Sequence, residues 1–257
     1  MAPTSEPDTT RVLFVRHGET TWNREGRIQG WASTPLTGRG RDQARATGVL
    51  LRDRGVERVL ASDLRRTQET ARLLREGTRA TGGGRHGPDG GGDRPSDGGG
   101  RGPGPGETTD GSNDGDRQPV DGEHPGVDAP ISFGQAWRER DFGDYQGLGR
   151  ETIAERHDEY DGDGSLSAVG SVPGGESLEE FRRRVVDGWE SLLACVEDET
   201  VAVVTHGGPL RVVFAEITGR DVPTVANEWS PDNCGVTEVD VSSAAEVVRR
   251  DDTSHLE

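Results

Sequence analysis

The chain has 257 residues, a formal net charge of −17 and 29% hydrophobic residues. This length is enough for one domain with a well-buried core. The acidity argues against general affinity for nucleic acid, because the chain would repel the phosphates, so any phosphate binding must be local. No apolar run approaches the roughly 20 residues that cross a bilayer, which argues against a membrane partner.

All 30 basic side chains are arginine, since the sequence contains no lysine. Dense carboxylates without lysine are typical of a surface adapted to high salt, where screening relieves their mutual repulsion. The alternative is an acidic face for a basic partner, and the spread of acidic residues along the chain disfavours it. We therefore expect a halophilic source.

Nothing in the sequence suggests export or metal binding. The first residues lack the basic and apolar segments of a secretory signal, and Cys195 and Cys234 are too far apart for a redox or metal motif. These features favour a reducing, cytoplasmic location. His86, His124 and His157 have no ligand-pair spacing, so we expect no metal site and no cofactor.

The hydrophobic pattern predicts alternating strands and helices after a polar tail over residues 1–10. The expected elements are, in chain order, a strand over 11–15, a helix over 37–54, a strand over 58–61, a helix over 63–76, a strand over 131–139, a helix over 151–159, a capped helix over 177–196, a strand over 201–205, a helix over 208–217, and strands over 235–241 and 246–249. Such alternation predicts an α/β fold of three α/β/α layers with a mostly parallel central sheet. The predicted single domain spans 11–250, followed by a polar tail over 251–257.

Residues 81–126 interrupt this pattern. They hold 17 of the 39 glycines, and Val120 is their only aliphatic side chain. Such a segment cannot bury enough apolar surface to offset its ordering entropy, so we expect a disordered insertion. It joins a helix to the next strand. In a parallel sheet such connections lie at the edge opposite the one that binds ligands, so we expect the insertion to lie away from the site.

Two apolar strands are each followed by a histidine. Arg16 and His17 follow the first strand, and His206 follows Val201–Thr205. The carboxyl ends of parallel strands are where open α/β sheets usually bind ligands. Packing alone does not explain why each of two strands is followed by a histidine at the same edge of the sheet.

The motifs around these histidines resemble those of the histidine phosphatase superfamily, which includes cofactor-dependent phosphoglycerate mutase. The matching blocks are Arg16–Thr20 with Trp22 and Asn23, Arg27–Trp31, Pro35–Thr37 with Gly40, Gln43 and Ala44, Ser62–Ala71, Arg138–Gly143 with Gln146 and Gly147, Pro173–Ser177, and Thr205–Gly208. They follow the family order over nearly all of residues 11–240. The resemblance implies a phosphoglycerate mutase-like fold.

The resemblance also implies roles for individual residues. His17 matches the family nucleophile, which forms a phosphohistidine, and Glu139 matches the proton donor. Arg16, Arg66 and His206 match the phosphate pocket, where fixed cations would meet the charge of the transferred group.

Some of these assignments leave alternatives open. Asp141 competes with Glu139 for the proton-donor role, although the spacing to the following glycine favours Glu139. The family spacing from the preceding serine favours Arg66 over Arg65. Asn23 and Gln29 are implied as contacts to the phosphate or substrate, and a turn-forming role also fits Asn23.

The function expected from the resemblance is hydrolysis of a small phosphorylated metabolite through a phosphohistidine intermediate. A 2,3-bisphosphoglycerate-dependent phosphoglycerate mutase is the nearest alternative. Gln29 and the pair Gly207-Gly208 after His206 favour the phosphatase branch. A non-catalytic adaptor that binds phosphorylated ligands is the alternative from another class. The natural substrate and oligomeric state are not fixed by these motifs.

Overall fold

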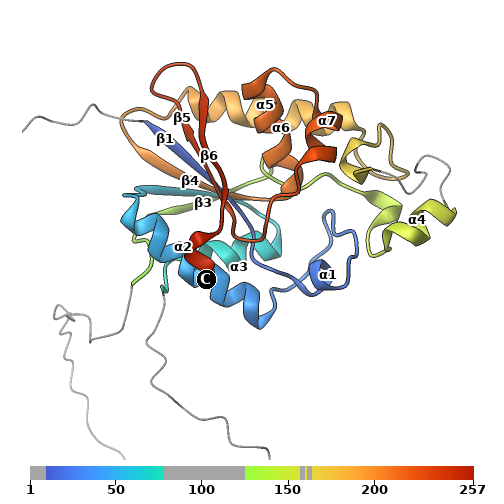
Figure 1. Cartoon of the computed structure of the whole chain (residues 1–257), viewed down its shortest axis with the longest axis horizontal. Coiled ribbons are helices and arrows are strands. Elements are labelled where there is room, and N and C mark those ends of the chain that lie inside the picture. Colours follow the sequence, from blue (N-terminus) through green and yellow to red (C-terminus); the bar gives the residue numbers. More distant parts are fainter. Residues whose placement is uncertain (1–9, 78–124, 157–159, 161–163) are drawn as a thin grey trace, which may run out of the picture.

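The computed structural model describes residues 10–77, 125–156, 160 and 164–257. Within these residues, six strands form one sheet in the order β3-β2-β4-β1-β5-β6 (Figure 1). Their bounds are β1 Arg11–Arg16, β2 Arg58–Ser62, β3 Ile131–Gly134, β4 Thr200–Thr205, β5 Val236–Asp240 and β6 Glu246–Asp252.

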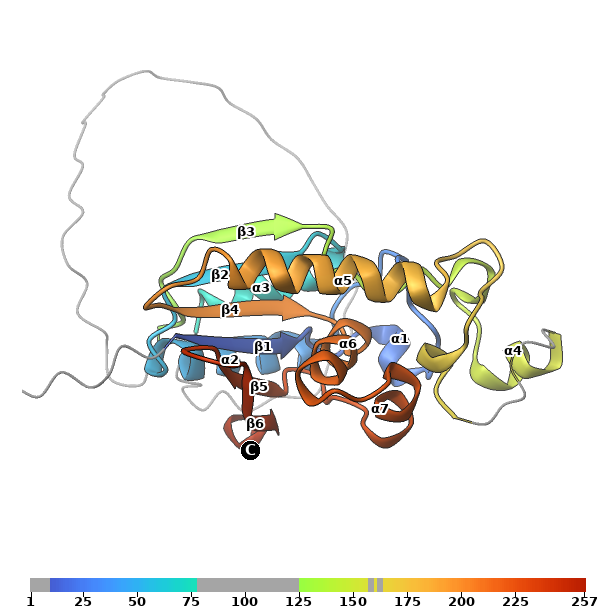
Figure 2. The same ribbon diagram turned by 90° about the horizontal axis from the view of Figure 1, so that it is seen from above.

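The sheet is parallel on one side and antiparallel on the other. Strands β1, β2, β3 and β4 pair in parallel, whereas β5 is antiparallel to both β1 and β6. The prediction of an α/β fold with a mostly parallel sheet is therefore confirmed. In Figure 2 the arrowheads of β1, β3 and β4 all point toward the end of the molecule that carries α1 and α6.

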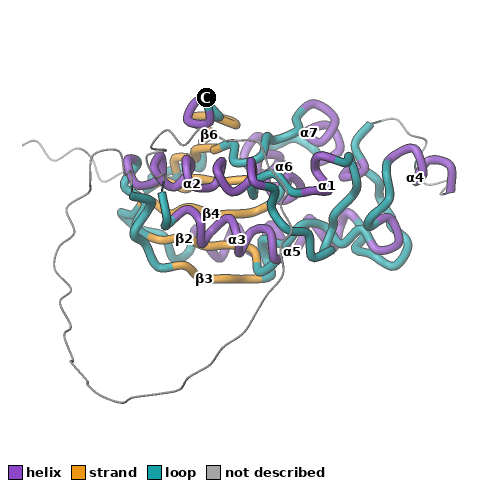
Figure 3. The backbone as a smooth tube through the Cα atoms, turned by 90° about the horizontal axis from the view of Figure 1, so that it is seen from below, coloured by secondary structure: helices purple, strands orange, loops and turns teal. Residues whose placement is uncertain are grey.

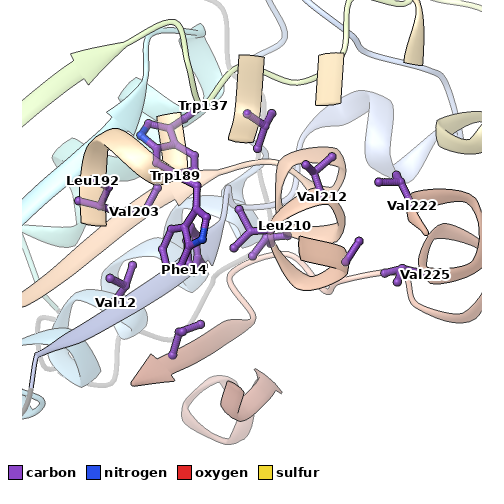
Figure 4. Packing of buried hydrophobic residues seen from close by; sticks show 14 of the residues in the cluster. Val12, Phe14, Trp137, Trp189, Leu192, Val203, Leu210, Val212, Val222 and Val225 are labelled. Atoms are coloured by element: carbon purple, nitrogen blue, oxygen red, sulfur yellow. The ribbon is translucent and has the colours of Figure 1, made fainter. Parts of the chain in front are cut away.

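Helices cover both faces of the sheet because β1 and β4 are apolar on both sides. Val12 and Phe14 face a core formed with α5 (Leu178–Leu193) and α6 (Gly207–Thr218), where Phe14 packs on Trp137 and Trp189 (Figure 4). Leu13 and Val15 face the opposite core, formed with α2 (Gly38–Asp53) and α3 (Arg65–Leu74) (Figure 3). Strands buried on both faces are typical of parallel sheets.

The helix ends follow sequence signals. Ser177 and Glu180 form the predicted capping box of α5, with Ser177 Oγ accepting from Glu180 N at 3.2 Å. Helix α6 ends at Gly219, whose φ of 64° is the left-handed conformation that glycine adopts most readily. The short helices α1 (Thr21–Arg24) and α7 (Val222–Glu228) were not expected.

A small lobe lies beyond the sheet, at the end to which the parallel strands point. It contains α4 (Arg150–Arg156) and the 3-10 turns η1 (Gly143–Tyr145) and η2 (Leu166–Ala168) (Figure 1). A separate apolar cluster forms its core, made of Phe142, Tyr145, Ile153, Tyr160, Leu166 and Val172. We call this part the cap lobe.

The largest differences from the predicted boundaries lie at β3 and at the C-terminal end of the chain. Strand β3 ends at Gly134, not at 139, so Glu139 lies in the following loop. Residues 251–257 are not a tail, because Asp251 and Asp252 close β6 and the turn η3 (Ser254–Leu256) packs on α2. His255 Nε2 lies 2.9 Å from Thr47 Oγ1 of α2, and Leu256 joins the apolar contacts there.

Most of the predicted insertion and nearly all of the predicted N-terminal tail lie outside the described residues. At the far end of the insertion, Gly126 is buried, so this residue belongs to the folded domain. None of the described helices is long and apolar enough to cross a membrane.

Candidate active site

The carboxyl ends of β1 and β4 bring the two predicted histidines together. Arg16 at the end of β1 is in register with Thr205 at the end of β4. His17 N continues the ladder by donating to Thr205 O at 2.9 Å, and the ring centroids of His17 and His206 are 5.2 Å apart. Both rings are almost fully buried.

The surroundings of His17 fix its protonation. Its Nδ1 lies 2.8 Å from Gly18 O, and since a carbonyl only accepts, Nδ1 must carry the hydrogen. Burial, Arg66 and Arg16 hold the pKa of His17 well below the ordinary value of 6.5. The ring is therefore neutral near pH 7, with its lone pair on Nε2, as a nucleophile requires.

Arg66 and His206 form a second buried pair. Arg66 Nε donates to His206 Nδ1 at 3.2 Å, so His206 Nε2 carries the hydrogen, 2.9 Å from Ser62 Oγ at the end of β2. Burial, followed by the charge of Arg66, lowers the pKa of His206 well below 6.5. His206 is therefore neutral near pH 7, and the positive charge of the pocket belongs to the arginines.

The two terminal nitrogen atoms of Arg66 fix the orientation of its guanidinium group. Its Nη2 donates to Gly30 O at 2.7 Å and its Nη1 to Ala32 O at 3.2 Å. The side chain is 1% exposed, and burial lowers its pKa to about 10, so it stays charged at neutral pH. Arg65, its neighbour, is exposed and lines a different hollow.

A loop that follows α7 holds Arg16. Arg16 Nη1 donates to Pro231 O, while its buried Nε has no hydrogen-bond partner. The carboxylate of Asp251 in β6 anchors this loop by accepting from Asp232 N at 3.0 Å and Trp229 Nε1 at 3.2 Å. A buried, unpaired N–H is costly, and an anion in the pocket would satisfy it.

Glu139 reaches the same pocket and Asp141 does not. Glu139 lines the pocket with Arg16, His17 and Arg66, whereas Asp141 lines a separate hollow beside α5. The backbone of Glu139 is fixed, because its carbonyl accepts from Trp31 Nε1 at 2.7 Å and from Arg184 Nη2 at 3.1 Å. Of the two carboxyl groups, Glu139 is the one that shares a pocket with His17.

Asn23 and Gln29 also line the pocket, and their side-chain oxygens are already engaged. Asn23 Oδ1 accepts from Thr20 N at 3.1 Å in the cap of α1. Gln29 Oε1 lies 2.9 Å from Thr20 Oγ1 and 2.5 Å from Thr34 Oγ1. The side-chain amide nitrogen is therefore the group that each residue could offer to an anion.

The sequence reasoning missed Arg211 and the cap-lobe residues of the pocket. Arg211 lines the pocket four residues after Gly207, one helical turn along α6. Arg150, Ser165 and Ser167 reach it from the cap lobe. The helical spacing after His206 could have indicated Arg211, whereas the cap-lobe residues carry no local signal.

The described residues contain no group of three or more histidine, cysteine or acidic side chains that could hold a metal ion. The charge in the pocket is supplied by guanidinium groups. Helix α6 adds to it, because its N-terminus begins directly after His206.

Comparison with known proteins places these motifs in one family. A family model described as "Histidine phosphatase superfamily (branch 1)" matches residues 12–81 and 119–252. A curated relative, a 2,3-bisphosphoglycerate-dependent phosphoglycerate mutase of Gloeothece citriformis, is 29% identical over 229 residues, which cover 84% of this chain and 89% of that protein.

Solved structures share the fold at low identity. Bacillus stearothermophilus YhfR superposes with a TM-score of 0.71 at 24% identity, covering 96% of this chain and 100% of that one. A mycobacterial glucosyl-3-phosphoglycerate phosphatase gives 0.66 at 22% identity, covering 95% and 100%.

Proposed function

Because the chain belongs to the histidine phosphatase superfamily, we propose that it hydrolyses a small phosphomonoester through a phosphohistidine at His17. The observation that carries this proposal is the contact of His17 Nδ1 with Gly18 O, which leaves the lone pair on Nε2. The pKa of His17 is lowered, and the ring shares its pocket with the buried Arg66, the half-buried Arg16 and the carboxyl group of Glu139.

In the first step, His17 Nε2 attacks phosphorus and the ester P–O bond breaks. Arg16 and Arg66 offset the charge on the three equatorial oxygens, with the free Nε of Arg16 available to one of them. The leaving oxygen takes a proton from the Glu139 carboxyl group, so the alcohol departs neutral.

In the second step, water attacks the phosphohistidine and gives its proton to the Glu139 carboxylate. The P–N bond breaks, its electron pair returns to Nε2, and inorganic phosphate leaves. The neutral form of His17 is restored, since the hydrogen stays on Nδ1, which donates to Gly18 O throughout.

A single-turnover experiment tests this mechanism. Wild-type protein mixed with a 32P-labelled phosphomonoester and quenched should yield an acid-labile, base-stable phosphoenzyme, and p-nitrophenyl phosphate should be turned over. The variant His17→Ala should lose both signals while still folding. Substantial activity in His17→Ala, with label on another residue, would refute the proposal. Binding without turnover by wild type would favour the adaptor.

A mutase remains the second candidate because curated relatives such as the Gloeothece protein are mutases by name. The glycine at position 208 does not separate the two activities. A Cβ there would collide with Glu139 Oε1 and lie 2.9 Å from the Phe181 ring, which explains the glycine on packing grounds alone. Incubation with 3-phosphoglycerate and catalytic 2,3-bisphosphoglycerate discriminates, since a mutase yields 2-phosphoglycerate and a phosphatase yields inorganic phosphate.

A further inference from the structure

The pocket around His17 holds more positive charge than one phosphoryl group requires. Within the described residues, its lining includes one carboxylate, Glu139, and five arginines, which are Arg16, Arg27, Arg66, Arg150 and Arg211. The whole chain carries a net charge of −17, so this concentration of cations runs against the rest of the molecule. Two of the five arginines are already assigned to the transferred phosphoryl group.

Arg211 is held in the pocket by neutral groups. Its Nε donates to Trp229 O at 2.7 Å and its Nη1 to Ser167 Oγ at 3.0 Å, and both partners are neutral. In the described part of the chain, no carboxylate forms an ion pair with it. Burial lowers its pKa to about 10, so the guanidinium stays charged.

Three other arginines, two half-buried and one fully buried, show the contrast. Arg138 forms an ion pair with Asp63 through two hydrogen bonds of 2.6 Å each, and Arg184 forms an ion pair with Glu176 at 2.7 Å. Arg140 has no carboxylate partner, but its three donor nitrogens bond the carbonyls of Val169, Gly170 and Glu176, which fixes a loop of the cap lobe. Arg211 keeps a free terminal nitrogen, Nη2, and lines the pocket.

Arg211 also lies close to the reacting centre. A Cβ built on Gly207 would be 3.8 Å from Arg211 Nη1 and 4.0 Å from Arg16 Nε, so the two guanidinium groups are near neighbours. Its bond to Ser167 places it at the junction of α6 and the cap lobe. A substrate with phosphorus at His17 would extend its leaving group past Glu139 toward this junction.

We propose that Arg211 binds a second anionic group, a carboxylate or a second phosphate, in the leaving part of the substrate. This inference rests on the proposed hydrolase function and deepens it, because it restricts the substrate to phosphomonoesters of acidic alcohols or to bisphosphates. Trp229 O and Ser167 Oγ hold the guanidinium in direction, and its remaining N–H groups meet the anion.

A matched substrate series tests the proposal. The compounds are 3-hydroxypropyl phosphate, O-phospho-3-hydroxypropionate and propane-1,3-diol bisphosphate, which share a three-carbon chain and differ in the remote group. We expect wild type to prefer at least one anionic member by about 10- to 100-fold in kcat/KM. The preferred member shows whether the second anion is a carboxylate or a phosphate.

The variant Arg211→Gln should remove that preference, chiefly through KM, so that kcat/KM falls much more on the preferred anionic compound than on the neutral one. Arg211→Lys should restore part of it, because the charge is kept without the forked geometry. Arg183→Gln, at an exposed arginine of α5 outside this pocket, serves as the control and should behave as wild type. Melting temperatures should show that each variant is folded.

The outcomes separate this inference from the function on which it rests. If wild type hydrolyses all three compounds equally, the second anion site is wrong and the hydrolase stands. The same holds if Arg211→Gln loses activity equally on all three, because Arg211 would then contact the transferred phosphoryl group or only support the fold. If wild type turns over none of these compounds and no aryl phosphate, the hydrolase proposal itself fails.

Discussion

The carboxylate of Glu139 accepts a hydrogen bond from Gly208 N, 3.2 Å from Oε2, in the first turn of α6. Its other oxygen accepts from Arg140 N at 3.0 Å. Two backbone N–H groups therefore hold the side chain where it lines the pocket. A fixed position suits the proton-donor role proposed for Glu139, because the group need not be reoriented when substrate binds.

Replacing this acid should affect substrates according to their leaving groups. In Glu139→Gln the amide oxygen can still accept a hydrogen bond from Gly208 N. The amide, however, has no acidic proton to give to the leaving oxygen. We expect alkyl phosphates to slow by about 100-fold or more and p-nitrophenyl phosphate, whose leaving group needs little protonation, by much less. Steady-state kcat on both substrates measures the difference. Equal losses would move the acid to another residue, with Asp141→Asn the next variant to test.

Adjacent glycines in α6 offer a matched pair of variants. Gly208→Ala places a methyl group against Glu139 Oε1 and the Phe181 ring, whereas the methyl of Gly207→Ala meets no atom closer than 3.8 Å. We expect Gly208→Ala to lower the free energy of unfolding by about 1–3 kcal/mol and to displace the acid. Gly207→Ala should unfold like wild type. Urea denaturation of both measures this, and equal stabilities would contradict the close packing at position 208.

The depressed histidine pKa values predict how stability depends on pH. For His17 and His206 the folded pKa lies well below 6.5, so below pH 6.5 the unfolded chain binds protons that the folded chain cannot. Their contribution is fully present above about pH 6.5 and is lost as pH falls toward the folded pKa values, by about 1.4 kcal/mol per unit for each histidine.

Urea unfolding at pH 7.5 and 5.5, in a buffer without phosphate, measures this loss. The variant His17→Asn should show a shallower dependence on pH than wild type. His255→Gln is a useful comparison, because burial also lowers the pKa of this histidine, which does not line the pocket. Identical pH dependence in wild type and His17→Asn would mean that His17 is not held neutral by its surroundings.

The charge of the chain predicts a response to salt. With a net charge of −17 and no lysine, carboxylate repulsion should weaken as potassium chloride rises from dilute to molar. We expect the melting temperature to rise by several degrees, while KM rises because the same screening weakens the arginine contacts to phosphate. A melting temperature that stays flat or falls would count against a halophilic source.

The predicted insertion can be tested by removal. Val127 N donates to Leu74 O at 3.0 Å, so the chain flanking the insertion is joined at the end of α3. Helix α3 carries Arg66 of the pocket in its first turn and ends at Leu74, more than two turns further along the chain. Replacing residues 81–124 by a short Gly-Ser linker should leave kcat/KM unchanged and stabilise by about 1 kcal/mol. A raised KM or altered substrate preference would show that the insertion contributes to the site.

The strand-then-histidine pattern was enough to predict the centre of the pocket. Apolar runs and parallel pairing bring His17 and His206 to one edge, and those features are local in sequence. The hydrogen-bond partners of the arginines were not predictable. Arg66 donates to Gly30 O and Arg16 to Pro231 O, and both carbonyls lie in loops, whose sequences show no periodic pattern. The tail after 250 was misjudged for a related reason. Its polar residues, such as Asp251 and His255, make specific hydrogen bonds that an apolar pattern does not record.

The contacts of the pocket also connect distant parts of the chain. Arg16 and Pro231 are 215 positions apart, and Arg66 and His206 are 140 apart. Contacts of such separation form late in folding, because long loops must close before they are made. Arg16 and Arg66 therefore come into position only when both ends of the domain have met. During refolding, recovery of phosphate binding should coincide with the slowest phase, so the ligand reports complete assembly of the domain and not a local intermediate.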